Sequence, residues 1–167
     1  VSGTATLLLS EAVFTGGNEN IDAVHVRGDG SLIISTAGPA TIDGTLFDDG
    51  DLIEIIPGNN ADLAAGDLGD GTADVFLAET VFALEGDNLE PTEDIDAVYV
   101  SDAGGPELVI TLSTNSDATL VDPAGFTFRN GDLVGLTPSS GEARLAFEEN
   151  PAAGKTFLGE VAGYREE

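Results

Sequence analysis

The sequence predicts an all-β protein built from two tandem four-stranded antiparallel repeats and a ninth strand. First, residues 3–14 return as residues 71–82, and a partial third copy opens at residues 141–147, so the repeat fixes the architecture. Second, short runs of Val, Ile, Leu and Thr alternate with Gly, Asp, Asn and Pro, which is typical of strands joined by turns. Third, no window keeps the apolar spacing of an amphipathic helix over three turns.

Further landmarks recur in the same order along the two copies: residues 21–26 match 95–100, 35–42 match 113–120, 47–52 match 128–133, and Pro57 matches Pro138. The offset grows from 68 positions (Gly3 to Gly71) to 81 (Asp51 to Asp132), so the length changes lie between the landmarks, where loops tolerate them. We interpret residues 1–167 as a single domain. It contains repeats at 3–70 and 71–140, a partial third repeat at 141–150 and a C-terminal tail at 151–167.

Four strands are predicted in each repeat, at 6–9, 21–26, 31–35 and 52–56, and then at 74–77, 95–100, 107–112 and 133–136, with the ninth strand at 144–147. Two apolar runs meet at Gly28-Asp29-Gly30, whose residues tolerate positive φ, so we expect a β-hairpin there. Residues 57–71 have no full counterpart and are interpreted as an inserted loop. The tail is compatible with one short helix or one more strand.

Three arrangements of these strands remain open. They can form a β-sandwich, close into a barrel, or make blade-like sheets of the kind found in propellers. A propeller normally needs at least four blades, so a propeller-like ring would require several chains. The strand at the third copy can complete the chain's own sheet or that of a neighbouring chain, which would give a filament.

The composition is strongly acidic, with 31 acidic and 5 basic residues and a net charge of −26. Nucleic acid and anionic membrane surfaces are therefore disfavoured as partners, because both are bound by Lys and Arg. No apolar run approaches the roughly 20 residues that span a bilayer, so we expect no membrane insertion.

Cysteine is absent, which removes disulfides and thiolate metal sites. A chain that begins at Val1 is compatible with a removed export signal, and an acid-rich, lysine-poor surface fits a saline setting outside the cell.

The repeat carries the landmarks Asp-Ile-Asp-Ala-Val at 94–98, Ser-Thr-Ala-Gly at 35–38 and Asp-Gly-Asp-Leu at 49–52. In these it resembles the tandem four-stranded β repeats of exported, acidic bacterial proteins of unknown role. The resemblance covers most of the chain and implies an extracellular or cell-surface location. It transfers no functional residue to this sequence.

Acidic clusters precede the second strand of each repeat, and they are the candidate metal site. The residues are Glu19, Asn20 and Asp22 in the first repeat and Glu93, Asp94 and Asp96 in the second. Calcium takes six to eight oxygen ligands from such groups. The alternative interpretation is a solvated acidic rim.

Four aspartates need partners of their own. Strict alternation places Asp22 and Asp96 on the same strand face as the following two valines, where each must accept backbone N–H bonds or ligate a cation. The same two interpretations apply to Asp51 and Asp132, each of which follows a turn glycine.

No catalytic constellation is recognised in the sequence. The only histidine, His25, is matched by Tyr99 in the second copy, which favours packing of a flat ring over a catalytic role. We therefore expect a non-enzymatic extracellular structural and interaction module that self-associates through strand edges, or binds other cell-surface components, with its acidic loops neutralised by cations. The alternative is a calcium-dependent module, including a carbohydrate-binding one, within a β ring made of several chains. A hydrolase with an acidic site ranks last.

Overall fold

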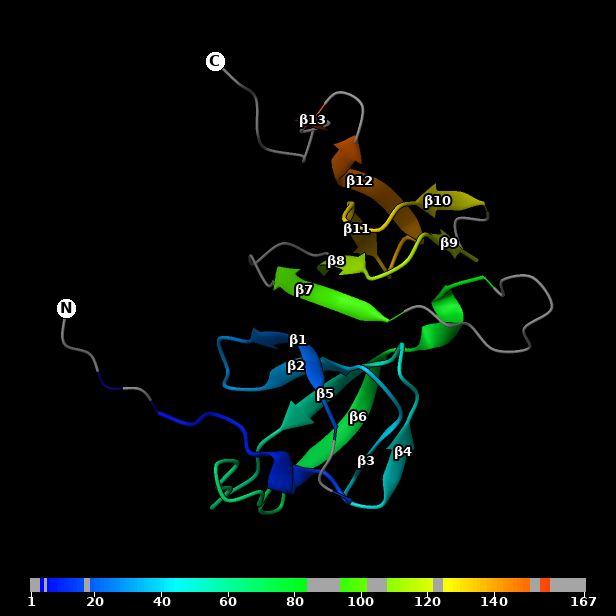
Figure 1. Cartoon of the computed structure of the whole chain (residues 1–167). Coiled ribbons are helices and arrows are strands. Elements are labelled where there is room, and N and C mark those ends of the chain that lie inside the picture. The colour runs from blue at the N-terminus through cyan, green and yellow to red at the C-terminus, as the bar shows by residue number, and fades with distance from the viewer. Residues whose placement is uncertain are drawn as a thin grey trace.

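The computed structural model describes residues 4, 6–16, 19–83, 94–101, 108–121, 125–150 and 154–156. These residues form strands and two short 3-10 turns, and no α-helix occurs among them. Figure 1 shows two β units, one above the other, and neither is closed into a barrel. The all-β, two-repeat prediction is confirmed, and of the arrangements left open the sandwich-like one agrees with the structure. No helix in the described part is long and apolar enough to cross a membrane.

The first β unit is a four-stranded antiparallel sheet covered on one face by a small hairpin. The sheet has the order β1-β2-β5-β6, with β1 (Ile21–Val26), β2 (Leu32–Thr36), β5 (Leu52–Ile56) and β6 (Thr72–Leu77). The hairpin of β3 (Ala40–Ile42) and β4 (Thr45–Phe47), together with the 3-10 turn η1 (Glu11–Val13), covers the sheet. Alternate residues of β2 and β5 pack against this cover, and the shared core is Val13, Phe14, Leu32, Ile34, Ala40, Ile42, Phe47, Ile53 and Ile55.

The second β unit repeats this plan. Its sheet has the order β13-β12-β11-β8-β7, with β7 (Ile95–Ser101), β8 (Val109–Thr114), β11 (Leu133–Thr137), β12 (Glu142–Asn150) and β13 (Gly154–Thr156). The hairpin of β9 (Ala118–Leu120) and β10 (Phe126–Phe128), with the turn η2 (Glu79–Val81), supplies the cover. Phe82 and Phe128 of this core occupy the positions of Phe14 and Phe47 in the first unit. The matched phenylalanines are therefore core residues.

The boundaries of the β units differ from those of the sequence repeats. β6 opens the second copy in sequence, yet it pairs with β5 and completes the first sheet. In the same way β12, the third copy, pairs with β11 and completes the second sheet. The second and third copies therefore each contribute their opening strand to the unit before them.

Eight of the nine predicted strands are present as β1, β2, β5, β6, β7, β8, β11 and β12. The strand predicted at 6–9 is wrong, because residues 6–10 have no regular secondary structure. Its later copies pair with β5 and β11, which precede them in the chain, and no strand precedes residues 6–9 in the described part. The Gly28-Asp29-Gly30 hairpin is confirmed: the amide of Arg27 donates to the carbonyl of Ser31 at 2.9 Å, and the Asp29 carboxylate accepts from the Ser31 amide at 3.0 Å.

Candidate functional site

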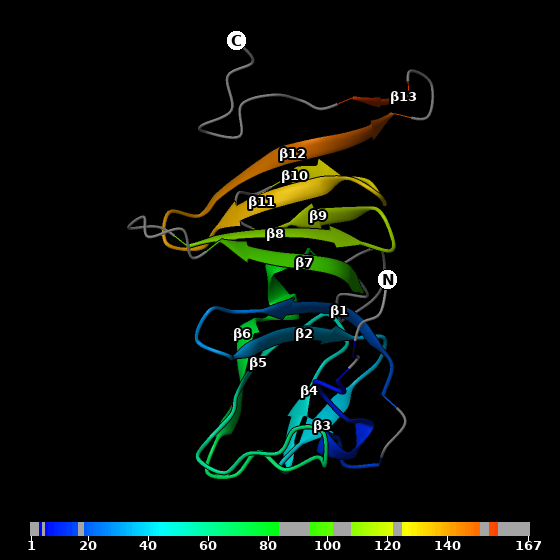
Figure 2. The same ribbon diagram turned by 90° about the vertical axis from the view of Figure 1, so that its left-hand side faces the viewer.

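The junction between the two units is formed by strand β7, which packs against both β1 and β2 of the first sheet. Figures 1 and 2 show β7 directly above β1. Two fully buried residues of the first sheet, Ile33 and Leu52, belong to the core of the second unit. At the surface of the junction the rings of His25 and Tyr99 meet edge to face, with centroids 5.2 Å apart. The only histidine therefore packs against its own counterpart from the other repeat.

Asp22 and Asp96 both lie in β-bulges, where the register shifts between Ile21 and Ala23 and between Ile95 and Ala97. A bulge adds one residue to the strand, so the strict alternation assumed for these side chains does not hold here. Instead of lying among core residues, Asp22 accepts a hydrogen bond from the Asn20 amide at 3.0 Å, and Asp96 accepts one from the Ser113 hydroxyl.

Asp94 is the most perturbed acid at the junction. Burial raises the pKa of its carboxyl to about 6, and the neighbouring carboxyls of Asp22, Asp49 and Asp96 add to the shift. Oδ2 of Asp94 accepts from the Asn115 amide at 2.9 Å, whereas Oδ1 is buried without a donor. Since two carboxylates have no hydrogen to share, Asp22 can hydrogen-bond to Asp94 only when one of them holds a proton.

The predicted metal ligands are thus brought together in part. Asp22, Asp94 and Asp96 gather at the junction, with Asn20 bound to Asp22. Glu19 lies in the segment leading into β1, and Glu93 lies outside the described residues. Among the residues that the structure describes, no three acidic or histidine side chains form a group suited to a metal ion.

Asp49 was not among the predicted ligands, and it reaches the junction from the turn before β5. The turn itself is visible in the sequence as Asp-Asp-Gly. Its position beside the second repeat is not, because it depends on how the two sheets stack.

Asp51 and Asp132 are buried and accept backbone hydrogen bonds, as one of the two interpretations predicted. Asp51 accepts from the amide of Asp48 at 3.1 Å and from that of Glu79 at 2.8 Å. Asp132 accepts from the amide of Arg129 at 2.9 Å. These carboxylates close the same turn in each unit, so their role is structural.

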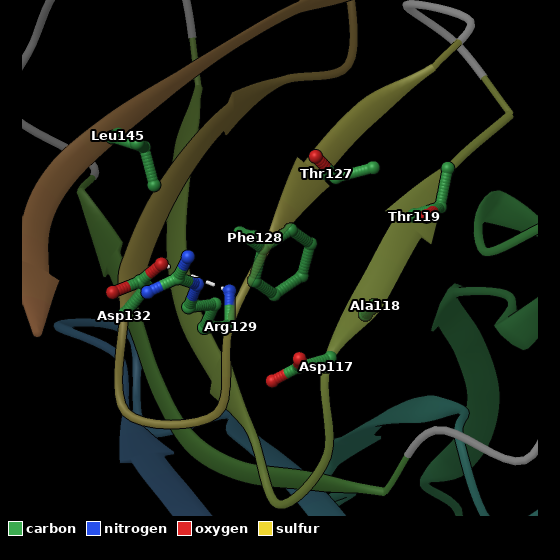
Figure 3. A pocket seen from close by; sticks show the side chains of 8 residues that line it. All are labelled: Asp117, Ala118, Thr119, Thr127, Phe128, Arg129, Asp132 and Leu145. Atoms are coloured by element: carbon green, nitrogen blue, oxygen red, sulfur yellow. Dashed lines mark hydrogen bonds between the residues drawn. The ribbon is translucent and has the colours of Figure 1, made fainter.

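A pocket of about 400 Å³, which no sequence motif predicted, lies beside the second hairpin. Figure 3 shows Arg129 beside Asp132, with Thr119 and Thr127 on the hairpin strands. Asp117, on the same wall, accepts a hydrogen bond from the amide of Asn130 at 3.0 Å. Because Asp117 and Asp132 both bind turn amides, the polar lining holds the turn in place.

Compared with known proteins, the chain matches no family model, no curated protein and no solved structure.

Proposed function

We propose that this chain is a non-enzymatic structural and interaction module of the cell exterior, which assembles with further copies of itself through exposed β-strands. The observation that supports the proposal is the position of its exposed apolar side chains. Val24 and Val26 lie on β1, Val75 on β6 and Tyr99 on β7, and all three are outer strands of their sheets in hydrogen-bonding order. Outer strands with apolar side chains are the places where sheets associate.

The extended segment before η1 adds to this surface. Leu7 and Leu8 are 61% and 51% exposed, although the matching residues of the later copies lie in paired strands. Side chains of this kind are normally covered in a soluble domain when they cluster. We infer that association between chains covers them.

The charge of −26 opposes association unless ions screen it. At about 1 M salt the screening length falls to about 3 Å, so contacts between acidic chains become possible. This requirement favours a saline extracellular setting, in which cations neutralise the acidic loops. It also supports the prediction of an exported protein.

A non-enzymatic role is favoured by how the polar groups are used. His25 packs on Tyr99, and the buried Asp51 and Asp132 bind turn amides. The most perturbed acid, Asp94, faces other carboxyls rather than a nucleophile. None of these arrangements positions an acid, a base and a nucleophile for one reaction.

The test is the mass of the native particle, measured by sedimentation velocity and light scattering in about 1 M NaCl. We expect species heavier than the 17.0 kDa chain, growing with protein concentration. A single monomeric species at every concentration and salt level would contradict the proposal.

The second candidate is calcium-dependent binding, with carbohydrate as one class of ligand. It is favoured by the carboxyls that converge on Asp94, whose buried Oδ1 has no donor. A cation bridging Asp22 and Asp94 would remove the need for a shared proton, but the six to eight oxygens of a calcium site would have to include water and backbone carbonyls. Thermal melting with calcium and with a chelator tests this candidate. Identical melting temperatures would rule out a specific calcium site, and silence on a glycan array in calcium would rule out the carbohydrate.

A further inference from the structure

We propose that a second copy of the chain docks head to tail on the free face of the second sheet, and so reproduces between chains the junction that joins the two units within one chain. The inference rests on the proposed self-association and names the surfaces that carry it. One surface is β1 of the incoming chain, with Val24 and Val26. The other is the face of the second sheet that presents Tyr99, Thr111 and Leu133.

The internal junction has two unlike sides. The first unit offers a sheet face, from which Ile33 and Leu52 enter the core of the second unit. The second unit offers its outer strand β7, including the buried Val100. The core of the first unit, by contrast, contains only first-unit residues in the described part of the chain. Because the two sides differ, two stacked units leave one side of each kind unoccupied. The first unit keeps an unused incoming side, and the second unit keeps an unused receiving side.

Although β1 lies beside β7 at the internal junction, its side chains Val24 and Val26, which form the incoming side, remain exposed. Val24 and Val26 correspond to Val98 and Val100, since both pairs lie at the same register against β2 and β8. Val26 is 49% exposed whereas Val100 is 2% exposed. Val24, at 54% exposure, matches Val98, which packs against the second core. The first unit therefore exposes two valines whose counterparts in the second unit are partly buried (Val98) and fully buried (Val100).

The receiving side is free on the second unit. Leu133 is 36% exposed, while its counterpart Leu52 is fully buried in the core of the second unit. Tyr99 is 59% exposed even though one edge of its ring meets His25. In a second junction of the same form, Tyr99 takes the place of His25 and meets the histidine of the incoming chain.

The polar residues at these positions are better matched between chains than within one chain. Inside the chain, Asp22 faces Asp94, a carboxyl against a carboxyl. The counterpart of Asp22 is Asp96, and the counterpart of Asp94 is Asn20, because the Asn20 and Asp94 carbonyls accept equivalent bonds from Ala37 and Asn115. Docking would place Asp96 against Asn20, a carboxylate against an amide donor.

A second carboxyl of the internal junction also has an amide side chain as its counterpart in the contact between chains. Asp49, which reaches the internal junction from the turn before β5, corresponds to Asn130 in the turn before β11. Asp48 N–H donates to Asp51 as Arg129 N–H donates to Asp132, which aligns the two turns. The contact between chains thus carries two carboxyls where the internal one carries four. Charge complementarity favours a second copy as the occupant.

Because the two sides differ, the contact does not close on itself in a pair. A heterologous contact of this kind adds chains one after another, into an open fibre or a ring. Each unit would then contact only its neighbours, as in repeat arrays.

Two variants with one damaged side each provide the test. The double change Val24→Ser/Val26→Ser removes the incoming side, and Leu133→Asp removes the receiving side. In about 1 M NaCl we expect each variant alone to associate at least about tenfold more weakly than the unmodified chain, as judged by sedimentation. Mixed in equal amounts, they should form a dimer and nothing larger, because one intact side of each remains. Leu46→Ser removes an exposed apolar side chain of β4 that lies outside both surfaces, and it should leave the association unchanged.

A third variant tests the polar pairing. Asn20→Asp would place a second carboxyl against Asp96 of the neighbouring chain, so this variant should associate more weakly than the unmodified chain at neutral pH. Circular dichroism and thermal melting show that each variant is folded, and Leu133→Ser replaces Leu133→Asp should the latter unfold.

The outcomes separate the two proposals. A monomeric unmodified chain would overturn both this inference and the proposed self-association. Association that survives both side variants, or a mixture that never yields dimers, would overturn the stacking contact alone.

Discussion

The buried carboxylate of Asp51 accepts a hydrogen bond from the backbone amide of Glu79, 28 residues further along the chain. Asp51 stands in the turn before β5, and Glu79 opens the η2 turn of the second unit. The same carboxylate binds the amide of Asp48. One side chain thus fixes the turn of the first unit and the connection to the second.

Replacing Asp51 by alanine should lower the free energy of unfolding by about 2–4 kcal/mol, because two amides lose a charged acceptor and one of the bonds is buried. Urea unfolding followed by circular dichroism measures the change. Asp48→Ala is the matched control, since it removes an exposed charge but keeps the backbone amide that donates. An equal loss of stability in both variants would show that charge, and not the hydrogen bonds, is responsible.

Asp94→Asn should stabilise the protein at neutral pH. The folded-state pKa of about 6 lies above the unfolded value of about 3.9, so the folded chain holds the proton more tightly. The cost of ionising Asp94 is absent below about pH 4 and complete above about pH 6, and stability falls as the pH rises through this window. The variant should lose that part of the pH dependence.

Melting temperatures at pH 4 to 8 check this prediction for Asp94→Asn. The control is Asp74→Asn, which removes one exposed carboxyl from β6. If the melting temperature of Asp94→Asn depended on pH as it does in the unmodified chain, a specific role for Asp94 would be contradicted. The same conclusion would follow if both variants lost this pH dependence equally.

Gly71→Ala should destabilise the first unit by about 2–4 kcal/mol or prevent its folding. An added Cβ at Gly71 would overlap the carbonyl oxygen of Ile56 and the amide of Gly58, where the two ends of the inserted loop pass each other. Gly28→Ala, in the β1–β2 turn, meets no atom within 4 Å and should cost less than about 1 kcal/mol. Chemical denaturation of the two variants compares them directly, and equal costs would contradict the close approach.

Ile33→Ala should cost about 2–4 kcal/mol, because Ile33 is fully buried and leaves a cavity between the units. Its counterpart Thr111 is partly exposed, and Thr111→Ala should cost less than about 1 kcal/mol at low protein concentration. Denaturation curves of both variants test the asymmetry of the junction. Similar losses would mean that the two sheet faces are equally covered.

The strands that alternate or repeat were predictable, since β1 and β7 share the sequence Ile-Asp-Ala-Val and lie at matched places in their sheets. The hairpin strands β3, β4, β9 and β10 were missed because each has only three residues, too few to show a period. The strand at 6–9 was wrongly predicted for the opposite reason. Its residues suit a strand, but strand formation also requires a neighbour to pair with.

The sequence predicted three of the acids that meet at the junction, but neither Asp49 nor the way in which they meet. Asp22, Asp94 and Asp96 belong to the predicted acidic clusters of the two repeats. Neither cluster on its own indicates that the two lie next to each other in the folded chain. The bulges at Asp22 and Asp96 shift the side chains away from the alternation of an ideal strand. Contacts between matched positions, such as His25 and Tyr99, depend on the stacking of the sheets, which a single sequence does not specify.

The staggered boundary between repeats and sheets has a practical consequence for dissecting this protein. A fragment that ended at residue 70, where the first sequence repeat stops, would lack β6. The backbone N–H and C=O groups of β5 would then be unpaired, and the fragment would be prone to aggregation. The cut that preserves a complete first sheet falls after Leu77, and the remaining portion would then begin at η2 with all the strands of its own sheet.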